Sequence, residues 1–239
     1  MSKLDRELQR LGWPTDGRPG GTADGNTRCL AIDFARSADW PQAAALCQAL
    51  ADDLDLPTPA VSVSGSAGYR LWLALAEPVA VAEAGRFLAA LCGEYLAEVP
   101  DGHRRCHPAA GPTAAPGLAV EAVPALDAAT GKWSAFIDPG LGEMFVAEAG
   151  LDMAPNFDRQ ADLLAGIQLI ATADFRRALT TLTTPEPTAA AAAAPRHAGD
   201  RYADPHSFLL AVINDPTAST ADRIAAATAL LPYFARPAR

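Results

Sequence analysis

Two short segments of the chain, 61–64 and 69–75, place apolar residues at every second position on either side of a turn rich in serine and glycine. A period of two is typical of β-strands, and the short connection predicts a β-hairpin. One face of this hairpin would carry valine, tyrosine and leucine side chains, and the other would carry Ser62, Arg70 and Trp72. An arginine beside a tryptophan on the second face indicates a functional surface.

Four further segments complete a predicted domain. Strands are expected at 29–35 and 103–107, and apolar residues at helical spacing predict helices over 40–54 and 84–95. The order strand, helix, strand, strand, helix, strand is that of the split βαβ sheet of ferredoxin-like and RNA-recognition (RRM) folds. We therefore expect an α+β protein with its helices on one face of the sheet. The residues expected on the free face are Asp33, Ser62, Ser64, Arg70 and Trp72.

Composition changes along the chain predict its division into parts. The segment 183–203 is rich in threonine, proline and alanine without a core pattern, which is typical of a linker. After it, apolar residues at helical spacing predict two helices, too few to form a large core alone. The expected parts are a flexible N-terminal lead at 1–27 with a short helix near 4–11, the sheet domain at 28–107, an extension at 108–182 with a strand over 131–137 and helices over 141–149 and 160–182, the linker at 183–203, and a helical pair at 204–239.

The overall composition restricts the classes of function. The 239 residues carry a formal net charge of −9 and half of them are apolar, which favours a globular protein and argues against a nonspecific coat on nucleic acid. No uncharged apolar run approaches the roughly 18 residues that a membrane-spanning helix needs. The start of the chain lacks the apolar core of a signal peptide. We therefore expect a cytoplasmic protein with no membrane partner.

The four cysteines have no paired CxxC spacing. Cys47 and Cys92 lie on apolar faces of predicted helices, which is typical of reduced core residues. His103, Cys106 and His107 are metal-ligating residue types close together in the chain, but a second pair of ligands is missing. A zinc site is therefore the less favoured interpretation of this cluster.

Three features occur in a particular order along the sheet domain: a strand with Asp33 near its end, the string Ser64-Gly65-Ser66-Ala67-Gly68-Tyr69-Arg70-Leu71-Trp72, and Asp101 after the second helix. Together they resemble the catalytic core of archaeo-eukaryotic primases, or primase-polymerases, over about residues 28–107. The resemblance implies that Asp33 and Asp101 are catalytic acids that hold Mg²⁺ or Mn²⁺ for nucleotidyl transfer. The hairpin residues expected to contact nucleotide or phosphate are Ser64, Gly65, Arg70 and Trp72. Arg104 and Arg105, on the last predicted strand, are candidates for the rim of a phosphate-binding groove.

The sequence also departs from the pattern of that family. Ala35 stands where a second acid is expected, and Arg70 stands where the family has a histidine. Loss of one acid removes much of the anionic cage of a two-metal site, although the planar fork of Arg70 suits a phosphate. These departures predict a primase-like protein whose catalysis is degenerate.

Each candidate residue also has a structural interpretation. Asp33 would be a solvated or capping acid, and Asp101 would make the Pro-Asp-Gly turn. Arg70 and Trp72 would form a cation–π pair without a ligand. Arg104 and Arg105 would be an exposed strand end, and Ser64 and Gly65 would serve the hairpin turn. The sequence leaves these alternatives open.

Three functions follow from these patterns. The preferred one is a degenerate primase-polymerase-like protein that binds nucleotide or single-stranded DNA. The second is an active, metal-dependent primase or polymerase. The third is a non-enzymatic scaffold that binds a protein partner through the helices at 204–239. The string from Pro205 to Pro216 is similar to helical modules of phage and mobile-element proteins, which favours a role in the DNA metabolism of such elements.

Overall fold

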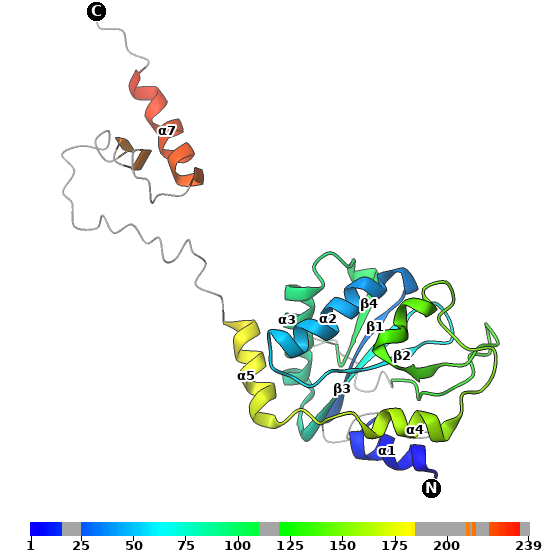
Figure 1. The fold of residues 1–239 in the computed structure, drawn as a ribbon. Helices are drawn as coiled ribbons and strands as arrows, with labels where there is room; N and C mark the ends of the chain where they lie inside the picture. Colours follow the sequence, from blue (N-terminus) through cyan, green and yellow to red (C-terminus); the bar gives the residue numbers. More distant parts are fainter. Residues whose placement is uncertain (16–24, 110–119, 185–208, 211, 214–219, 235–239) are drawn as a thin grey trace, which may run out of the picture. The chain divides into compact units, whose positions relative to one another are not determined.

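The computed structural model describes residues 1–15, 25–109, 120–184, 209–210, 212–213 and 220–234 (Figure 1). Met1–Thr184 form one compact unit, and Pro185–Arg239 form a second. Most of the predicted linker at 183–203 lies outside the described residues. Within the predicted helical pair, residues 209–210 and 212–213 are helical, and a second helix, α7, spans Thr220–Phe234.

The first unit is built on an antiparallel sheet, which confirms the α+β class. Among the described residues the sheet has five strands in the order β4-β1-β3-β2-β5. Four of them come from the predicted sheet domain, and the predicted strand near 131–137 adds the fifth beside β2. Their bounds are β1 Asn26–Phe34, β2 Ala60–Val63, β3 Tyr69–Ala80, β4 Arg104–His107 and β5 Ala135–Ile137.

One face of the sheet carries the larger core. The predicted helices α2 (Trp40–Asp52) and α3 (Val81–Tyr95) pack there, joined by α5 (Thr172–Thr183) (Figure 1). Phe87 of α3 and Phe175 of α5 meet with ring centroids 5.0 Å apart. The alternation in the sequence placed the strand residues of this core correctly; they are Leu30, Ile32, Phe34, Val61, Val63, Tyr69, Leu71, Leu73 and Leu75.

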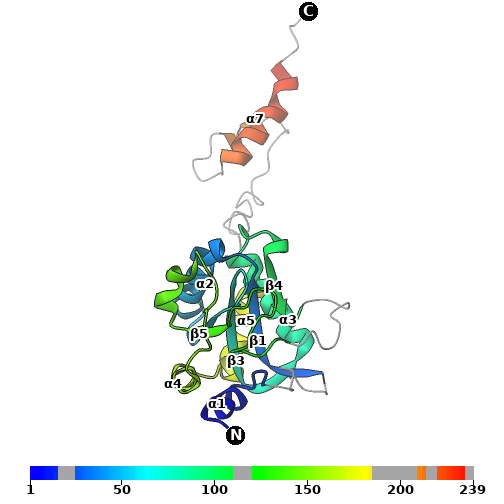
Figure 2. The same ribbon diagram turned by 90° about the vertical axis from the view of Figure 1, so that its right-hand side faces the viewer.

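The opposite face is partly covered, so the expectation that helices lie on one face only is wrong. Helices α1 (Lys3–Leu11) and α4 (Phe157–Ala165) lie side by side over it (Figure 2). With Trp13 they enclose a second core around Trp72 and Phe136. The short helix predicted near 4–11 is confirmed as α1, but this part of the chain is packed and is not a flexible lead. The leucines of α1 repeat at helical spacing and are buried in this core; they are Leu4, Leu8 and Leu11. Residues 16–24 lie outside the described residues.

The extension predicted at 108–182 contributes to both cores. The predicted helix over 160–182 is two helices, α4 and α5, separated at Gly166, and Ile170 between them bridges to Leu75 of β3. In place of the predicted helix over 141–149 there is a 3-10 segment, Pro139–Phe145, and residues 146–149 are not helical. No helix in the described parts of the chain combines the length and the apolar character needed to cross a membrane.

Candidate functional site

Asp33 lies at the centre of a polar cluster near the end of β1. Its neighbours in the sheet register are Arg70 on β3 and Arg105 on β4, and directly opposed residues of antiparallel strands share a face. Ser62 on β2 is opposite Arg70 and extends the same row. The sequence predicted the shared face of Asp33, Ser62 and Arg70 from alternation alone.

Both carboxylate oxygens of Asp33 accept hydrogen bonds. Arg70 Nε donates to Oδ1, and Arg70 Nη2 donates to Oδ2 over 3.1 Å. His107 Nε2 lies 2.9 Å from Oδ2. Since an ionised carboxylate can only accept, His107 Nε2 carries a hydrogen in this arrangement. Arg70 also donates from Nη1 to the backbone carbonyl of Glu121, 3.2 Å away.

Burial and charge act in opposite directions on Asp33. Its side chain is 23% exposed, and those of Arg70 and His107 are 15% and 8% exposed. Burial raises the pKa of Asp33, but the hydrogen bonds from His107 and Arg70 outweigh it and leave the pKa below its ordinary value. Asp33 is therefore a paired, ionised carboxylate whose charge Arg70 compensates.

A cleft of about 1060 Å³ opens beside this cluster. One wall is formed by the start of β4 and the 3-10 turn before it, η2 (Asp101–His103), and the other by residues 121–129. The charged and histidine side chains that line the cleft are Asp33, Arg70, Asp101, His103, Arg104, Arg105, His107, Glu121 and Asp127. The cleft therefore has a wall rich in arginine and histidine and a facing wall with two acids.

The two arginines of the β4 wall differ in their bonding. Arg104 folds back onto the end of α3, where it donates to the carbonyls of Cys92 and Leu96 and to Asp101 Oδ1. Satisfying the last carbonyls of a helix is a structural role for a basic side chain. Arg105 is exposed, and it makes no ion pair or hydrogen bond with any residue that the structure describes. Arg105 is thus the arginine of this wall that is available to a ligand.

Trp72 does not reach the cleft, and the prediction that it contacts a ligand is wrong. Its side chain is 1% exposed, its ring packs against Trp13 and Phe136, and its Nε1 donates to Ser62 Oγ over 2.9 Å. The guanidinium carbon of Arg70 lies 5.1 Å from the ring centroid. The structure therefore contains the alternative interpretation of these two residues, a cation–π pair of Arg70 and Trp72 without a ligand.

Ser64 and Gly65 shape the hairpin turn. Ser64 Oγ accepts hydrogen bonds from the backbone N–H groups of Ser66 and Gly68. Gly65 has a φ of +78°, and a Cβ there would lie 2.9 Å from the backbone nitrogen of Ser134. Ser64 also lines the cleft. The structure therefore supports the turn interpretation for both residues, with Ser64 at the margin of the site.

The acids do not fit the two-metal site that the resemblance implies. Asp33 is bonded through both oxygens to Arg70 and His107, and Asp101 is 94% exposed and paired with Arg104. Within the described ranges, no group of three or more histidine, cysteine or acidic residues is placed to hold a metal ion, and this includes the cluster His103, Cys106 and His107. Asp33 has no open carboxylate oxygen, and Asp101 alone does not supply the several oxygen ligands that a site for Mg²⁺ or Mn²⁺ would require.

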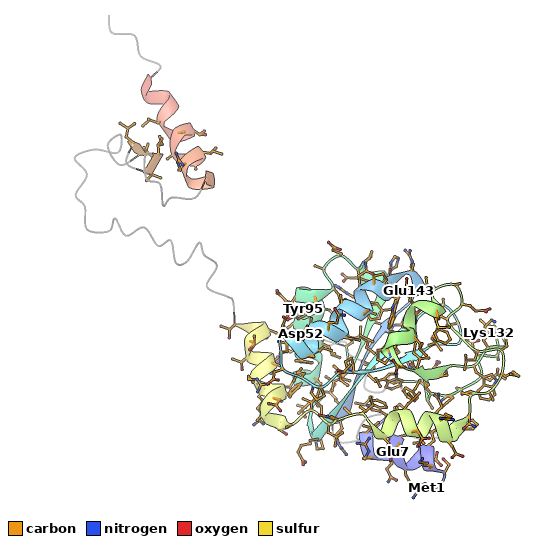
Figure 3. The ribbon with its side chains drawn as sticks, in the orientation of Figure 1. Met1, Glu7, Asp52, Tyr95, Lys132 and Glu143 are labelled. Atoms are coloured by element: carbon orange, nitrogen blue, oxygen red, sulfur yellow. The ribbon has the colours of Figure 1, made fainter. Side chains whose placement is uncertain are left out.

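The far wall of the cleft is held by ion pairs outside the site. Lys132, labelled in Figure 3, pairs with Glu148 and with Asp152, the latter over 2.8 Å. Asp127 Oδ1 accepts the backbone N–H groups of Ala129 and Thr130, which closes the turn before Lys132. These contacts fix the 127–133 segment, which continues from the cleft residues 121–127.

Sequence reasoning missed His107 as a partner of Asp33. The signal was present, because His107 lies two positions after Arg105 on the same strand and therefore on the same face. The contribution of the Glu121 carbonyl had no sequence signal, because that residue is distant in the chain and its backbone makes the contact.

The fold and the site define an α+β protein with a charged cleft at one end of an antiparallel sheet. Comparison with known proteins adds no family to this description. No protein-family model matches the chain, and no curated protein matches it.

Proposed function

We propose that the protein binds a nucleotide in the cleft beside Asp33, as a degenerate primase-polymerase-like protein of phage or mobile-element DNA metabolism. The observation that carries the proposal is the position of Arg105. It is an exposed arginine without a partner among the described residues, on the strand next to a neutralised Asp33, and it lines a cleft of about 1060 Å³.

The order of elements supports the primase-like part of the proposal. Along the chain the sheet is built as β1, α2, β2, β3, α3 and β4, and across it the order is β4-β1-β3-β2. This order supports a split βαβ fold of the ferredoxin-like or RRM type as part of the proposal.

Charge placement favours a phosphate at the β4 wall. Arg70 and His107 hold the carboxylate of Asp33, so this acid presents little net charge to an incoming anion. The guanidinium of Arg105 has five N–H donors in a planar fork that matches phosphate oxygens. In the proposed complex Arg105 binds the phosphate, while Arg70 and His107 compensate the charge of the neighbouring Asp33.

The facing wall favours a single nucleotide over a DNA strand. Proteins that hold single strands use exposed aromatic rings and a row of cations. The aromatic residues at this cleft, Phe34 and Tyr69, are buried, and Glu121 and Asp127 on the opposite side would repel a second phosphate. Leu126 is 52% exposed there and offers an apolar contact to a base. Carboxylates beside it would accept hydrogen bonds from sugar hydroxyls.

A titration with a fluorescent deoxynucleoside triphosphate tests the proposal. Removing an arginine contact to a phosphate should weaken binding by about 10-fold or more, since hydrogen bonds to charged groups contribute roughly 1.5–3 kcal/mol. Arg105→Ala is expected to show this loss. Arg86→Ala removes an exposed arginine on α3 that does not line the cleft, and it should bind as the unaltered protein does.

The same experiment separates the alternatives. A short fluorescent oligothymidine should bind more weakly than the nucleotide, and chelation of divalent cations should leave nucleotide binding detectable. Tighter binding of the oligonucleotide would replace the single-nucleotide proposal by a strand-binding one. Absence of binding for both probes would reject the site altogether.

A further inference from the structure

Two cysteine side chains meet behind the β4 wall. Cys92 on α3 and Cys106 on β4 have their Sγ atoms 3.3 Å apart. Cys106 is opposite Ile32 in the sheet register, so it faces the core with Ile32, whereas its neighbours Arg105 and His107 face the cleft. The thiol contact therefore joins α3 to the strand that carries the arginine of the site.

The surroundings of the pair favour ionisation at one sulfur. The pKa of Cys92 is lowered because the thiol of Cys106 donates to it, and the guanidinium of Arg104 acts in the same direction. The same hydrogen bond, together with burial, raises the pKa of Cys106. Arg104 is held close by its hydrogen bond to the carbonyl of Cys92 over 3.2 Å. The Cys92 side chain is 4% exposed, while Cys106 is partly exposed. The pair thus places a stabilised thiolate in contact with the sulfur of a less buried cysteine.

The other two thiols lack these properties. Cys29 and Cys47 are 3% and 6% exposed, and burial raises the pKa of each to about 12. Neither has a sulfur contact within the described residues. They serve as internal controls, because a general oxidation of buried thiols would modify Cys29 and Cys47 as well as the pair.

We propose that Cys92 and Cys106 form a reversible disulfide when the protein meets a hydroperoxide, and that this bond ties the edge strand β4 to α3. The two sulfurs are in contact, and they need to approach only to the S–S bond length of about 2.05 Å. The proposal is independent of the nucleotide, because it depends on the sulfur contact alone.

The chemistry balances with one equivalent of hydroperoxide. The Cys92 thiolate attacks one oxygen of the hydroperoxide. The O–O bond breaks, which leaves a sulfenic acid on Cys92 and, after protonation, an alcohol or water. The Cys106 sulfur then attacks the Cys92 sulfur, the S–O bond breaks, and hydroxide leaves with the Cys106 proton as water. Two thiols are oxidised to one disulfide, and the peroxide is reduced.

Intact mass and peptide mapping of the full chain test this. After stoichiometric hydrogen peroxide, the mass should fall by about 2 Da, the mass of two hydrogens, and the titratable thiols in denaturant should fall from the four in the sequence to two. A tryptic digest without reductant should contain peptide 87–104 joined to peptide 106–132, because each holds one cysteine of the pair. A dithiol reductant should restore the starting mass and all four thiols.

Matched variants distinguish the pair from the other thiols. Cys47→Ser should still lose about 2 Da, while Cys106→Ser and Cys92→Ser should not. If a variant fails to fold, the tryptic peptide map of the unaltered protein still shows which two cysteines are cross-linked. Addition of oxygen without a cross-link, a cross-link that includes peptide 29–36 or 37–70, or disulfides between two chains would each overturn the proposal.

Oxidation should also change stability in a measurable way. A disulfide between Cys92 and Cys106 closes the loop of residues 92–106 and so reduces the conformational freedom of the unfolded chain. The oxidised protein is expected to melt about 5 °C above the reduced protein. An oxidised form that melts at or below the reduced form would contradict a bond that fits the folded geometry.

Discussion

Arg70 donates two hydrogen bonds to the carboxylate of Asp33 from the directly opposite position on the neighbouring strand. The pair is fixed by backbone register, since β1 and β3 are adjacent and antiparallel in the sheet. His107 on β4 completes the cluster from the other side. Three strands therefore contribute one side chain each to a buried charge network, and β4, which supplies His107, also presents Arg105 to the cleft.

Removing the charge of Asp33 should destabilise the folded protein. Asp33→Asn leaves Arg70 largely buried without its counter-ion and replaces one acceptor oxygen by an NH₂ group, which faces the N–H donors of Arg70 or His107. We expect the free energy of unfolding to fall by about 2 kcal/mol, measured by urea denaturation at neutral pH. Asp152→Asn is the control, because Asp152 is 83% exposed in its pair with Lys132. It should change the free energy by less than about 0.5 kcal/mol. Equal effects of the two variants would contradict a buried network.

The contribution of Asp33 should depend on pH in a defined direction. Its pKa lies below the ordinary 3.8 because the hydrogen bonds from His107 and Arg70 outweigh burial. The folded protein therefore holds this proton less tightly than the unfolded chain does. The stabilisation is full above the ordinary pKa and is lost as the pH falls through the folded value.

Unfolding curves at several pH values measure this difference. The excess stability of the unaltered protein over Asp33→Asn should be full at about pH 5. It should shrink as the pH falls below 3.8. A difference that stays constant down to the acid limit of folding would show that Asp33 has no depressed pKa.

The sequence predicted the face of each strand residue but not whether that face is covered. Alternation placed Trp72 opposite the main core, and the structure agrees. Whether the ring meets a ligand or a second core depends on Trp13 and on α4, which lie far away in the chain. The spacing of the leucines in α1 predicted a helix, but no local pattern states which surface a helix will pack against.

Trp72 should therefore matter for stability and not for ligand binding. Trp72→Phe removes the donor to Ser62 and part of the ring contact with Trp13. We expect the free energy of unfolding to fall by roughly 2 kcal/mol, with nucleotide affinity changed less than about two-fold, since such a ratio corresponds to well under 1 kcal/mol. Thermal melting and the nucleotide titration check the two halves. A large loss of affinity in a stably folded variant would restore Trp72 as a ligand contact.

For the site, as for the rest of the sheet, the sequence predicted which residues share a face but not what they contact. The residue types at Asp33 and Arg70 indicated phosphate chemistry, and their parity placed them together. The pairing of their charges was not predictable, because it requires the exact register of β1 against β3 and the position of β4. The separation of Arg104 from Arg105 also needed the structure, since consecutive strand residues face opposite sides and only one of these two faces the end of α3.

The hairpin turn offers a test of backbone geometry next to the cleft. Gly65 has a φ of +78°, and the backbone of residues 132–134 occupies the space that a Cβ at this position would need. Gly65→Ala should lower the free energy of unfolding by about 1–3 kcal/mol, because an L side chain is strained there and the neighbouring backbone must move. Urea denaturation measures the change.

A second glycine provides the matched control. Gly93 lies in α3, and an added Cβ would meet nothing within 4 Å. Gly93→Ala should raise the free energy of unfolding by up to about 1 kcal/mol, since alanine has the higher helix propensity. If Gly65→Ala lowers the free energy of unfolding and Gly93→Ala raises it, the cause of the difference is the backbone environment of each glycine and not the added methyl group itself. If Gly65→Ala were neutral or stabilising, the turn would not require the left-handed conformation, and the close approach of residues 132–134 would be wrong.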